Sequence, residues 1–222
     1  MTYAALFVVV AALLFYAALT LDGAGLMLLW PALSFALVAA AYMGLGTRIF
    51  GKRRDGTLGW EFIVALFPYL LFTWTVWHLA RWMRREPAYH TIAPGLVAGR
   101  RLLSREIPDK IRTVVDLTAE FPEPRGVRTA GTYVSHPMLD ASVPTEAELR
   151  ELIDRISRSP EPVYIHCAEG HGRTGLVAAA VLVRKGLAKD AREALATLKR
   201  IRPGIALKPA QQALLHRVCD EG

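Results

Sequence analysis

The residues best suited to carry out chemistry lie in one stretch, 163–175, which reads VYIHCAEGHGRTG. An apolar run of strand length ends at His166-Cys167, a glycine-containing loop follows, and Arg173-Thr174 begins an apolar helix. Such a loop points successive backbone N–H groups inward at the positive end of a helix, which is the geometry that binds a phosphate group. The stretch therefore predicts a phosphate-binding loop with a cysteine at its base.

Two side chains of this loop predict what happens to the bound phosphate. The N–H groups and the helix end favour the thiolate form of Cys167, which is a nucleophile. Arg173 carries a planar guanidinium that can bind two phosphoryl oxygens at once. An inert buried thiol is the alternative for Cys167, but it would leave Arg173 and the glycines unexplained. No second Cys/His pair at zinc spacing is present in the sequence, so we expect neither a metal nor a cofactor.

The pattern HC-x5-RT at 166–174 resembles the signature of the cysteine-dependent protein tyrosine phosphatase superfamily, in its dual-specificity branch. The resemblance extends over most of residues 90–219. It includes PMLD at 137–140, where these enzymes carry a mobile-loop aspartic acid. It also includes RPG at 202–204 and PAQ at 209–211, which resemble the segment beside the active site in cell-cycle and lipid-phosphatase relatives.

The resemblance implies hydrolysis of a phosphate monoester through a cysteinyl-phosphate intermediate. Cys167 is then the nucleophile, Asp140 the general acid and base, and Thr174 a hydroxyl that hydrogen-bonds the sulfur and helps it leave. The expected phosphate-binding loop consists of His166, Ala168, Glu169, Gly170, His171, Gly172 and Arg173. Gln211 is expected to position the hydrolytic water and Arg202 to brace the site, unless both are ordinary polar residues at a helix boundary.

Other acidic residues are alternatives to Asp140 as the general acid. Asp116 follows the apolar run TVV and could equally be a turn or cap residue, as could Glu120 and Glu123 in the next loop. In the family that this sequence resembles, the acid precedes the catalytic loop by one helix and one strand. Asp140 has that position, just before a predicted helix, and is therefore favoured over Asp116.

The elements that must position these residues alternate between strands and helices. Strands are predicted at 96–99, 113–117, 132–136 and 162–167, and helices at 145–158, 173–185, 190–201 and 209–219. Thr145 with Glu148 forms a capping box, and Asp190 is the predicted N-cap of its helix. We therefore expect an α/β domain of the dual-specificity phosphatase type, with a central sheet flanked by helices.

Charge divides the 222 residues into two unlike parts. Residues 1–47 contain one charged side chain, Asp22, whereas residues 87–222 contain 20 Lys and Arg and 16 Asp and Glu. The apolar content of 53% excludes a disordered chain, and two cysteines exclude a disulfide scaffold. The net charge of +7 is spread along the chain without an aromatic-interleaved basic patch, so nucleic acid is not an expected partner.

The first part is expected to be a transmembrane helical region over residues 1–86, followed by a catalytic domain over 87–222. Three stretches approach the roughly 20 apolar residues that a spanning helix needs, namely 3–21, 25–46 and 60–80. A signal peptide is the alternative for the first, but no basic region precedes it. The lipid bilayer is thus an expected partner.

The positive-inside rule does not decide how the chain is oriented in the membrane. Basic residues cluster both at 48–54 and at 81–85, on opposite sides of the third stretch. Either the chain spans three times with a weak preference, or 60–80 is re-entrant or interfacial. A reactive thiolate is best kept reduced in the cytoplasm, so we expect an integral protein of the cell inner membrane with a cytoplasmic catalytic domain.

The substrate is expected to be a lipid headgroup or a phosphoprotein. The catalytic part begins a few residues after the third apolar stretch, which would keep it near lipid phosphates. Glu169 and the lack of lysine in the loop favour a single monoester, such as phosphatidylglycerophosphate, over a polyphosphorylated headgroup. The alternatives are a phosphotyrosine or dual-specificity protein phosphatase, an inactive phosphate-binding membrane adaptor, and a rhodanese-like sulfur transferase.

Overall fold

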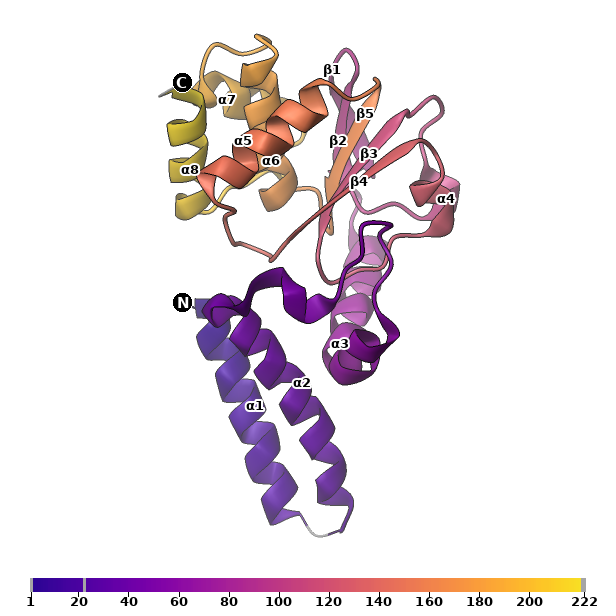
Figure 1. Ribbon diagram of the computed structural model, residues 1–222, viewed down its shortest axis with the longest axis vertical. Helices are drawn as coiled ribbons and strands as arrows, with labels where there is room; N and C mark the ends of the chain where they lie inside the picture. The colour runs from indigo at the N-terminus through magenta and orange to yellow at the C-terminus, as the bar shows by residue number, and fades with distance from the viewer. Residues whose placement is uncertain (1, 22, 221–222) are drawn as a thin grey trace. The chain divides into compact units, whose positions relative to one another are not determined.

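The computed structural model describes residues 2–21 and 23–220, which fold into two compact units (Figure 1). The first unit comprises Met1–Arg53, Thr57–Arg84 and Ala119–Pro122. The second comprises Arg54–Gly56, Arg85–Thr118 and Glu123–Gly222. Residues 54–56 thus belong to the second unit and residues 119–122 to the first, although their neighbours in sequence belong to the other unit.

The first unit is helical. Its main helices are α1 (Thr2–Thr20), α2 (Leu29–Ala40) and α3 (Trp60–Met83). Three stretches are long and apolar enough to cross a membrane: Tyr3–Thr20, Gly23–Phe50 and Trp60–Met83.

The predicted helix at 25–46 is not a single α-helix. The 3-10 turns Gly23–Leu28 precede α2, and a π-helical turn and a further 3-10 turn follow it up to Phe50. Gly44 and Gly46 have φ angles of +133° and +68°, which residues with a side chain rarely adopt. The regular helix therefore ends before these glycines.

Pro68 lies inside α3, and two side chains of α2 form hydrogen bonds around it. Proline displaces the carbonyl four residues earlier, which is that of Val64, and this oxygen accepts a bond from Trp30 Nε1 at 3.0 Å. The N–H of Tyr69 donates to Ser34 Oγ at 3.2 Å, and Ser34 is fully buried. Neighbouring side chains thus satisfy polar groups at the interruption, as a membrane helix requires.

The second unit is built on a five-stranded sheet in the order β1-β2-β5-β3-β4. Its strands are β1 (Tyr89–Ala93), β2 (Leu96–Arg100), β3 (Thr113–Thr118), β4 (Thr132–Met138) and β5 (Val163–Cys167). β1 is antiparallel to β2, and the other pairs are parallel. The carboxyl ends of β3, β4 and β5 consequently meet at one edge, where ligands bind in open α/β sheets.

Helices pack on the sheet, and the hydrophobic core lies between the helices and the strands. α5 (Glu146–Ser157), α6 (Gly172–Arg184), α7 (Ala191–Ile201) and α8 (Pro209–Asp220) gather on one face, while the short α4 (Arg125–Arg128) lies at the opposite side of the sheet (Figure 1). α6 carries ten buried residues, including Leu176 and Val177, and occupies the centre of the core. The predicted α/β class with a central sheet and flanking helices is confirmed.

Most predicted elements of this unit match the structure within two residues. The capping box at Thr145 is confirmed: its hydroxyl accepts the Glu148 N–H at 3.2 Å, and the Glu148 carboxylate accepts the Thr145 N–H at 2.7 Å. Asp190 caps α7 by accepting the Glu193 N–H at 2.8 Å. β1 and α4 were not predicted, because both are short and β1 lacks clear hydrophobic alternation.

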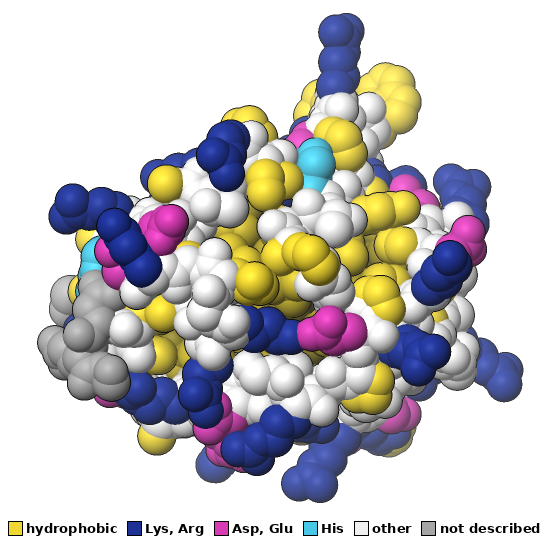
Figure 2. Space-filling view, turned by 90° about the horizontal axis from the view of Figure 1, so that it is seen from above, with side chains coloured by type: hydrophobic (Ala, Val, Ile, Leu, Met, Phe, Trp, Pro, Cys, Tyr) yellow, Lys and Arg dark blue, Asp and Glu magenta, His cyan; other side chains and the backbone are white. Residues whose placement is uncertain are grey.

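Charged side chains are dispersed on the visible face of Figure 2. Lys and Arg project at separate points around the rim, with Asp and Glu among them. This face therefore presents no continuous single-sign patch.

Candidate active site

The loop between β5 and α6 wraps around the sulfur of Cys167, the last residue of β5. Gly170 adopts φ +74°, and a Cβ built there would lie 2.3 Å from the Gly99 carbonyl carbon of β2. Only glycine fits both conditions. This tight turn lets the Gly170 N–H donate to Cys167 Sγ at 3.3 Å, a contact that stabilises a thiolate. Cys167 is 3% exposed.

Arg173 is held by the ends of two other strands. Its Nη1 donates to the Met138 carbonyl at 2.9 Å and to the Leu117 carbonyl at 3.4 Å, while the residue is 2% exposed. Backbone oxygens at the carboxyl ends of β4 and β3 thus orient the guanidinium from the first turn of α6. The backbone of the protein itself therefore holds the Arg173 side chain in place.

Asp140 reaches the same guanidinium from the loop after β4. Its Oδ1 lies 3.5 Å from Arg173 Nη2, and its side chain remains 61% exposed. The next residue, Ala141, has φ +55°, a conformation that costs a non-glycine residue about 1–2 kcal/mol. Strained backbone often marks a functional loop, and this strained residue directly follows Asp140.

Gln211, near the start of α8, links this acid-bearing loop to its surroundings. It is fully buried, and its Nε2 donates to the Ser142 carbonyl at 3.2 Å. A Cβ built at Gly172 would lie 3.4 Å from Gln211 Oε1, so the amide borders the catalytic loop. The structure therefore places Gln211 between the two loops, and its role toward a water molecule stays a prediction.

Arg202 braces the catalytic loop from outside. Its Nε donates to the Gly170 carbonyl at 3.0 Å and its Nη2 to the Glu169 carbonyl at 3.1 Å. Burial lowers the pKa of Arg202, and the nearby Glu86 carboxylate opposes that shift. His90 Nδ1 lies 3.2 Å from Arg202 Nη1. Burial and Arg202 lower the pKa of His90, so a neutral imidazole can accept this bond.

Two loop residues differ from the sequence-based expectation or extend it. The hydrogen bond described for the Thr174 hydroxyl goes to the Gly99 carbonyl at 3.5 Å, whereas we had expected it to go to the sulfur. The reason is that β2 lies beside β5 and offers an acceptor at the first turn of α6. His166 is fully buried and stacks on Tyr164 with ring centroids 5.4 Å apart. Its imidazole is therefore enclosed by the protein.

The competing acids lie elsewhere. Asp116 is fully buried and accepts bonds from the Thr118 hydroxyl at 2.7 Å and the Tyr133 hydroxyl at 2.6 Å. Burial and Asp116 raise the pKa of Tyr133 well above its usual value, so the phenol stays protonated and donates. Glu123 is also buried, with Arg101 Nε 3.4 Å away. Glu120 belongs to the first unit.

Asp116, Glu123 and His166 form the metal-capable cluster found among residues 2–21 and 23–220. Their ligand atoms lie within 4.8 Å of one another. The hydroxyl donors on Asp116 and the guanidinium beside Glu123 instead make this a network of compensated charges. The expectation that the site uses no metal stays a prediction.

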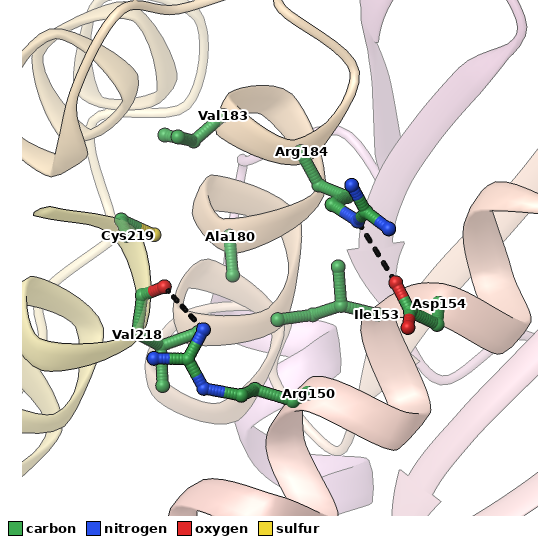
Figure 3. Close-up of a pocket in the computed structure, with 8 residues that line it drawn as sticks. All are labelled: Arg150, Ile153, Asp154, Ala180, Val183, Arg184, Val218 and Cys219. Atoms are coloured by element: carbon green, nitrogen blue, oxygen red, sulfur yellow. Dashed lines mark hydrogen bonds and ion pairs between the residues drawn. The ribbon is translucent and has the colours of Figure 1, made fainter. Parts of the chain in front are cut away.

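Cys219, the second cysteine, lies away from the catalytic loop. It lines a hollow between α5, α6 and α8 together with Ala180 and Val183 (Figure 3). Ala180 and Val183 are about 12 and 16 Å along α6 from its first residue, at 1.5 Å per residue. A direct disulfide with Cys167, which precedes α6, would require Cα atoms within about 7 Å. The geometry disfavours Cys219 as a redox partner.

Sequence reasoning missed Glu86, Tyr133 and the strand carbonyls that hold Arg173. In the β3–β4 pairing Tyr133 lies opposite Val114, two residues before Asp116. Tyr133 therefore shares a face of the sheet with Asp116, a relation that becomes visible only once the pairing of the strands is known. Glu86 had no local signal, because it lies in a short polar connection after α3.

Comparisons with known proteins bear on this site. Residues 101–187 match the family described as "Polymorphic toxin system, DSP-PTPase phosphatase". The human dual specificity protein phosphatase CDC14C is 28% identical over 107 residues, which cover 47% of this chain and 24% of that protein. The mouse protein CDC14B is 29% identical over 107 residues, covering 47% and 22%. The match thus spans about a quarter of the length of these relatives.

Solved structures show the same fold. Tk-PTP in the active form has a TM-score of 0.56 and 26% identity, covering 61% of this chain and 99% of that chain. PTPMT1 in complex with PI(5)P has a TM-score of 0.53 and 22% identity, covering 61% and 96%.

Proposed function

The second unit is a cysteine-dependent phosphatase domain of the dual-specificity type, and from this premise we propose that the protein hydrolyses phosphate monoesters through a cysteinyl-phosphate intermediate. One observation carries the proposal. Cys167 Sγ accepts a loop N–H at 3.3 Å, and Arg173 and Asp140 lie at the same strand ends, 3.5 Å apart. A nucleophile, a phosphate-binding cation and an acid therefore converge.

In the first step the thiolate of Cys167 attacks phosphorus. The S–P bond forms while the P–O bond to the leaving group breaks, and Asp140 donates its proton to the departing oxygen. The loop N–H groups and Arg173 stabilise the charge on the equatorial oxygens. A bound phosphate dianion competes with Asp140 for the guanidinium, which leaves the acid available to the leaving group.

In the second step a water molecule attacks the cysteinyl phosphate. Asp140, now a carboxylate, takes the proton from water, and the S–P bond breaks to release inorganic phosphate and restore the thiolate. Gln211, which borders the loop, is suited to hold this water.

We assign the substrate to the class of membrane lipids with one accessible phosphate monoester, such as phosphatidylglycerophosphate. Three candidate spans suggest membrane association. Five residues, 84–88, connect α3 to β1, and an extended chain of that length reaches about 18 Å. A spanning α3 would thus tether the domain near the headgroups. Glu169 disfavours headgroups with additional phosphates.

We place the domain on the cytoplasmic side of the cell inner membrane, because a reducing compartment protects the thiolate of Cys167, the nucleophile in this mechanism.

The test is phosphate release by the detergent-solubilised full chain. Its substrates are phosphatidylglycerophosphate, phosphoinositides, a phosphotyrosine peptide and p-nitrophenyl phosphate. Cys167→Ser should abolish turnover of all of them. Cys219→Ser is the matched control, since it replaces the second cysteine, which lies away from the loop, and should retain activity. Turnover by Cys167→Ser would refute the mechanism. Faster hydrolysis of the peptide than of any lipid would identify a protein phosphatase instead.

A further inference from the structure

The segment that follows α3 contributes an acidic side chain to the catalytic loop. Glu86 lies three residues after Met83, the last residue of α3, and belongs to the second unit. We propose that Glu86 is a positioning residue that holds the catalytic loop in its phosphate-binding shape by joining His171 to Arg202. This inference rests on the proposed phosphatase function and adds a residue to its machinery.

A single carboxylate oxygen makes both contacts. Glu86 Oε2 lies 2.7 Å from His171 Nε2 and 2.9 Å from Arg202 Nη2. The side chains of Glu86 and His171 are each 23% exposed, and that of Arg202 is fully buried. Charge-assisted hydrogen bonds of this length, partly shielded from water, are stronger than exposed surface pairs.

The two partners hold different parts of the same loop. His171 lies within it, and Arg202 binds the carbonyls of Glu169 and Gly170. Glu86 therefore closes a ring of contacts around the outer side of residues 169–171. Carbonyls that are tied outward leave the N–H groups of the loop directed inward, as binding a phosphate requires.

The surroundings of His171 support a specific fit. A Cβ built at Gly204 would lie 2.3 Å from His171 Nε2, so the absence of a side chain at 204 makes room for the imidazole. The Pro87 carbonyl, one residue after Glu86, accepts a bond from Arg202 Nη1 at 2.9 Å. Consecutive residues of the connecting segment thus bind the same arginine.

The first experiment compares Glu86→Gln with the wild type in the full chain, using p-nitrophenyl phosphate. Glu161→Gln is the matched control, since it removes an ion pair with Lys185. Glu161 lies just before the amino end of β5, whereas the catalytic loop follows its carboxyl end. We expect kcat to fall about tenfold in Glu86→Gln and KM to rise by a smaller factor, about two- to threefold, because a displaced loop weakens phosphate binding in the ground state and more so in the transition state. Equal kcat values in the two variants would overturn the proposal.

A second measurement does not depend on turnover. Calorimetric binding of inorganic phosphate should weaken in Glu86→Gln, while its thermal midpoint should match that of Glu161→Gln. An inactive wild type that still binds phosphate in a Glu86-dependent manner would refute the proposed function alone. Unchanged phosphate binding would refute the positioning role.

A double-mutant cycle tests the route of the effect. In a His171→Gln background, Glu86→Gln should lower kcat much less than it does in the wild type, because the ring is already open. Full additivity would show that Glu86 does not act through His171 and would overturn the proposal.

A pair of insertions tests whether the position of Glu86 matters. Gly-Ser inserted between Arg84 and Arg85 leaves Glu86 next to Pro87 and should preserve activity. The same dipeptide inserted between Glu86 and Pro87 moves the carboxylate away from the loop and should reproduce the Glu86→Gln defect. Equal activity of the two insertion variants would contradict the inference.

Discussion

The identity of the general acid depends on where two aspartates lie. Asp116 lies within β3 and is fully buried among hydroxyl donors, whereas Asp140 follows β4 and its side chain is 61% exposed beside Arg173. A proton donor must reach the leaving group of a bound substrate. Exposure next to Arg173, the cation that we propose binds the phosphate, meets this requirement, and a buried hydrogen-bonded carboxylate does not.

Replacing Asp140 should therefore change which substrates are hydrolysed well. We expect Asp140→Asn to slow hydrolysis of alkyl phosphates about a hundredfold. Aryl phosphates with good leaving groups need less protonation and should slow much less. The measurement is kcat/KM for a series of leaving groups of different basicity.

Asp116→Asn is the matched comparison for that series. It removes a charged acceptor from Thr118 and Tyr133, so we expect a lower thermal midpoint but no change in the ratio of alkyl to aryl rates. If Asp116→Asn produced the discrimination and Asp140→Asn did not, the assignment of the acid would be wrong.

At the scale of elements, α5 begins where the acid-bearing loop ends. Its first residue is Glu146, and the loop from Asp140 to Thr145 has no other regular structure. The Thr145–Glu148 capping box therefore anchors one end of the segment that carries Asp140.

Loss of this cap should destabilise the start of α5. Thr145→Ala removes the side-chain acceptor of the Glu148 N–H, which typically costs about 1 kcal/mol, and Thr145→Ser should restore it. Hydrogen exchange of the α5 amides in the solubilised chain measures the effect. Equal protection in Thr145→Ala and wild type would contradict the role of the cap.

The Thr145–Glu148 capping box also predicts that the stability of the start of α5 depends on pH. Hydrogen bonds from the Thr145 N–H and hydroxyl lower the pKa of Glu148. A carboxyl group whose pKa is lower in the folded state than in the unfolded state stabilises the folded state. This stabilisation is fully present above the unfolded pKa of about 4.3, and it is lost as the pH falls from there through the folded-state pKa. Protection of α5 should decline below about pH 4.3 in the wild type and less so in Thr145→Ala.

At the scale of the whole molecule, the three apolar stretches raise the question of orientation. Reporter fusions after residues 22, 55 and 88 should place 22 and 88 in the cytoplasm and 55 on the opposite side, as three spans with a cytoplasmic domain require. If the reporters fused after residues 55 and 88 lay on the same side of the membrane, the stretch 60–80 would not cross the bilayer.

Local patterns predicted the fold class and eight of the helices and strands of the second unit, but neither β1 nor α4. Strand and helix boundaries followed from apolar runs, and Thr145 and Asp190 were recognised as caps, because these signals act over a few residues. The loop at 166–174 could be predicted for the same reason, since strand, turn and helix start are contiguous in sequence.

The sequence by itself determined the type of chemistry, because the nucleophile, the glycines and the arginine are neighbours along the chain. Only the tertiary structure decided which distant groups complete the site. The Leu117 and Met138 carbonyls reach Arg173 because β3 and β4 end at the same edge as β5. Glu86 meets a loop 85 residues away in sequence, a contact that depends on chain packing and leaves no trace in local residue patterns.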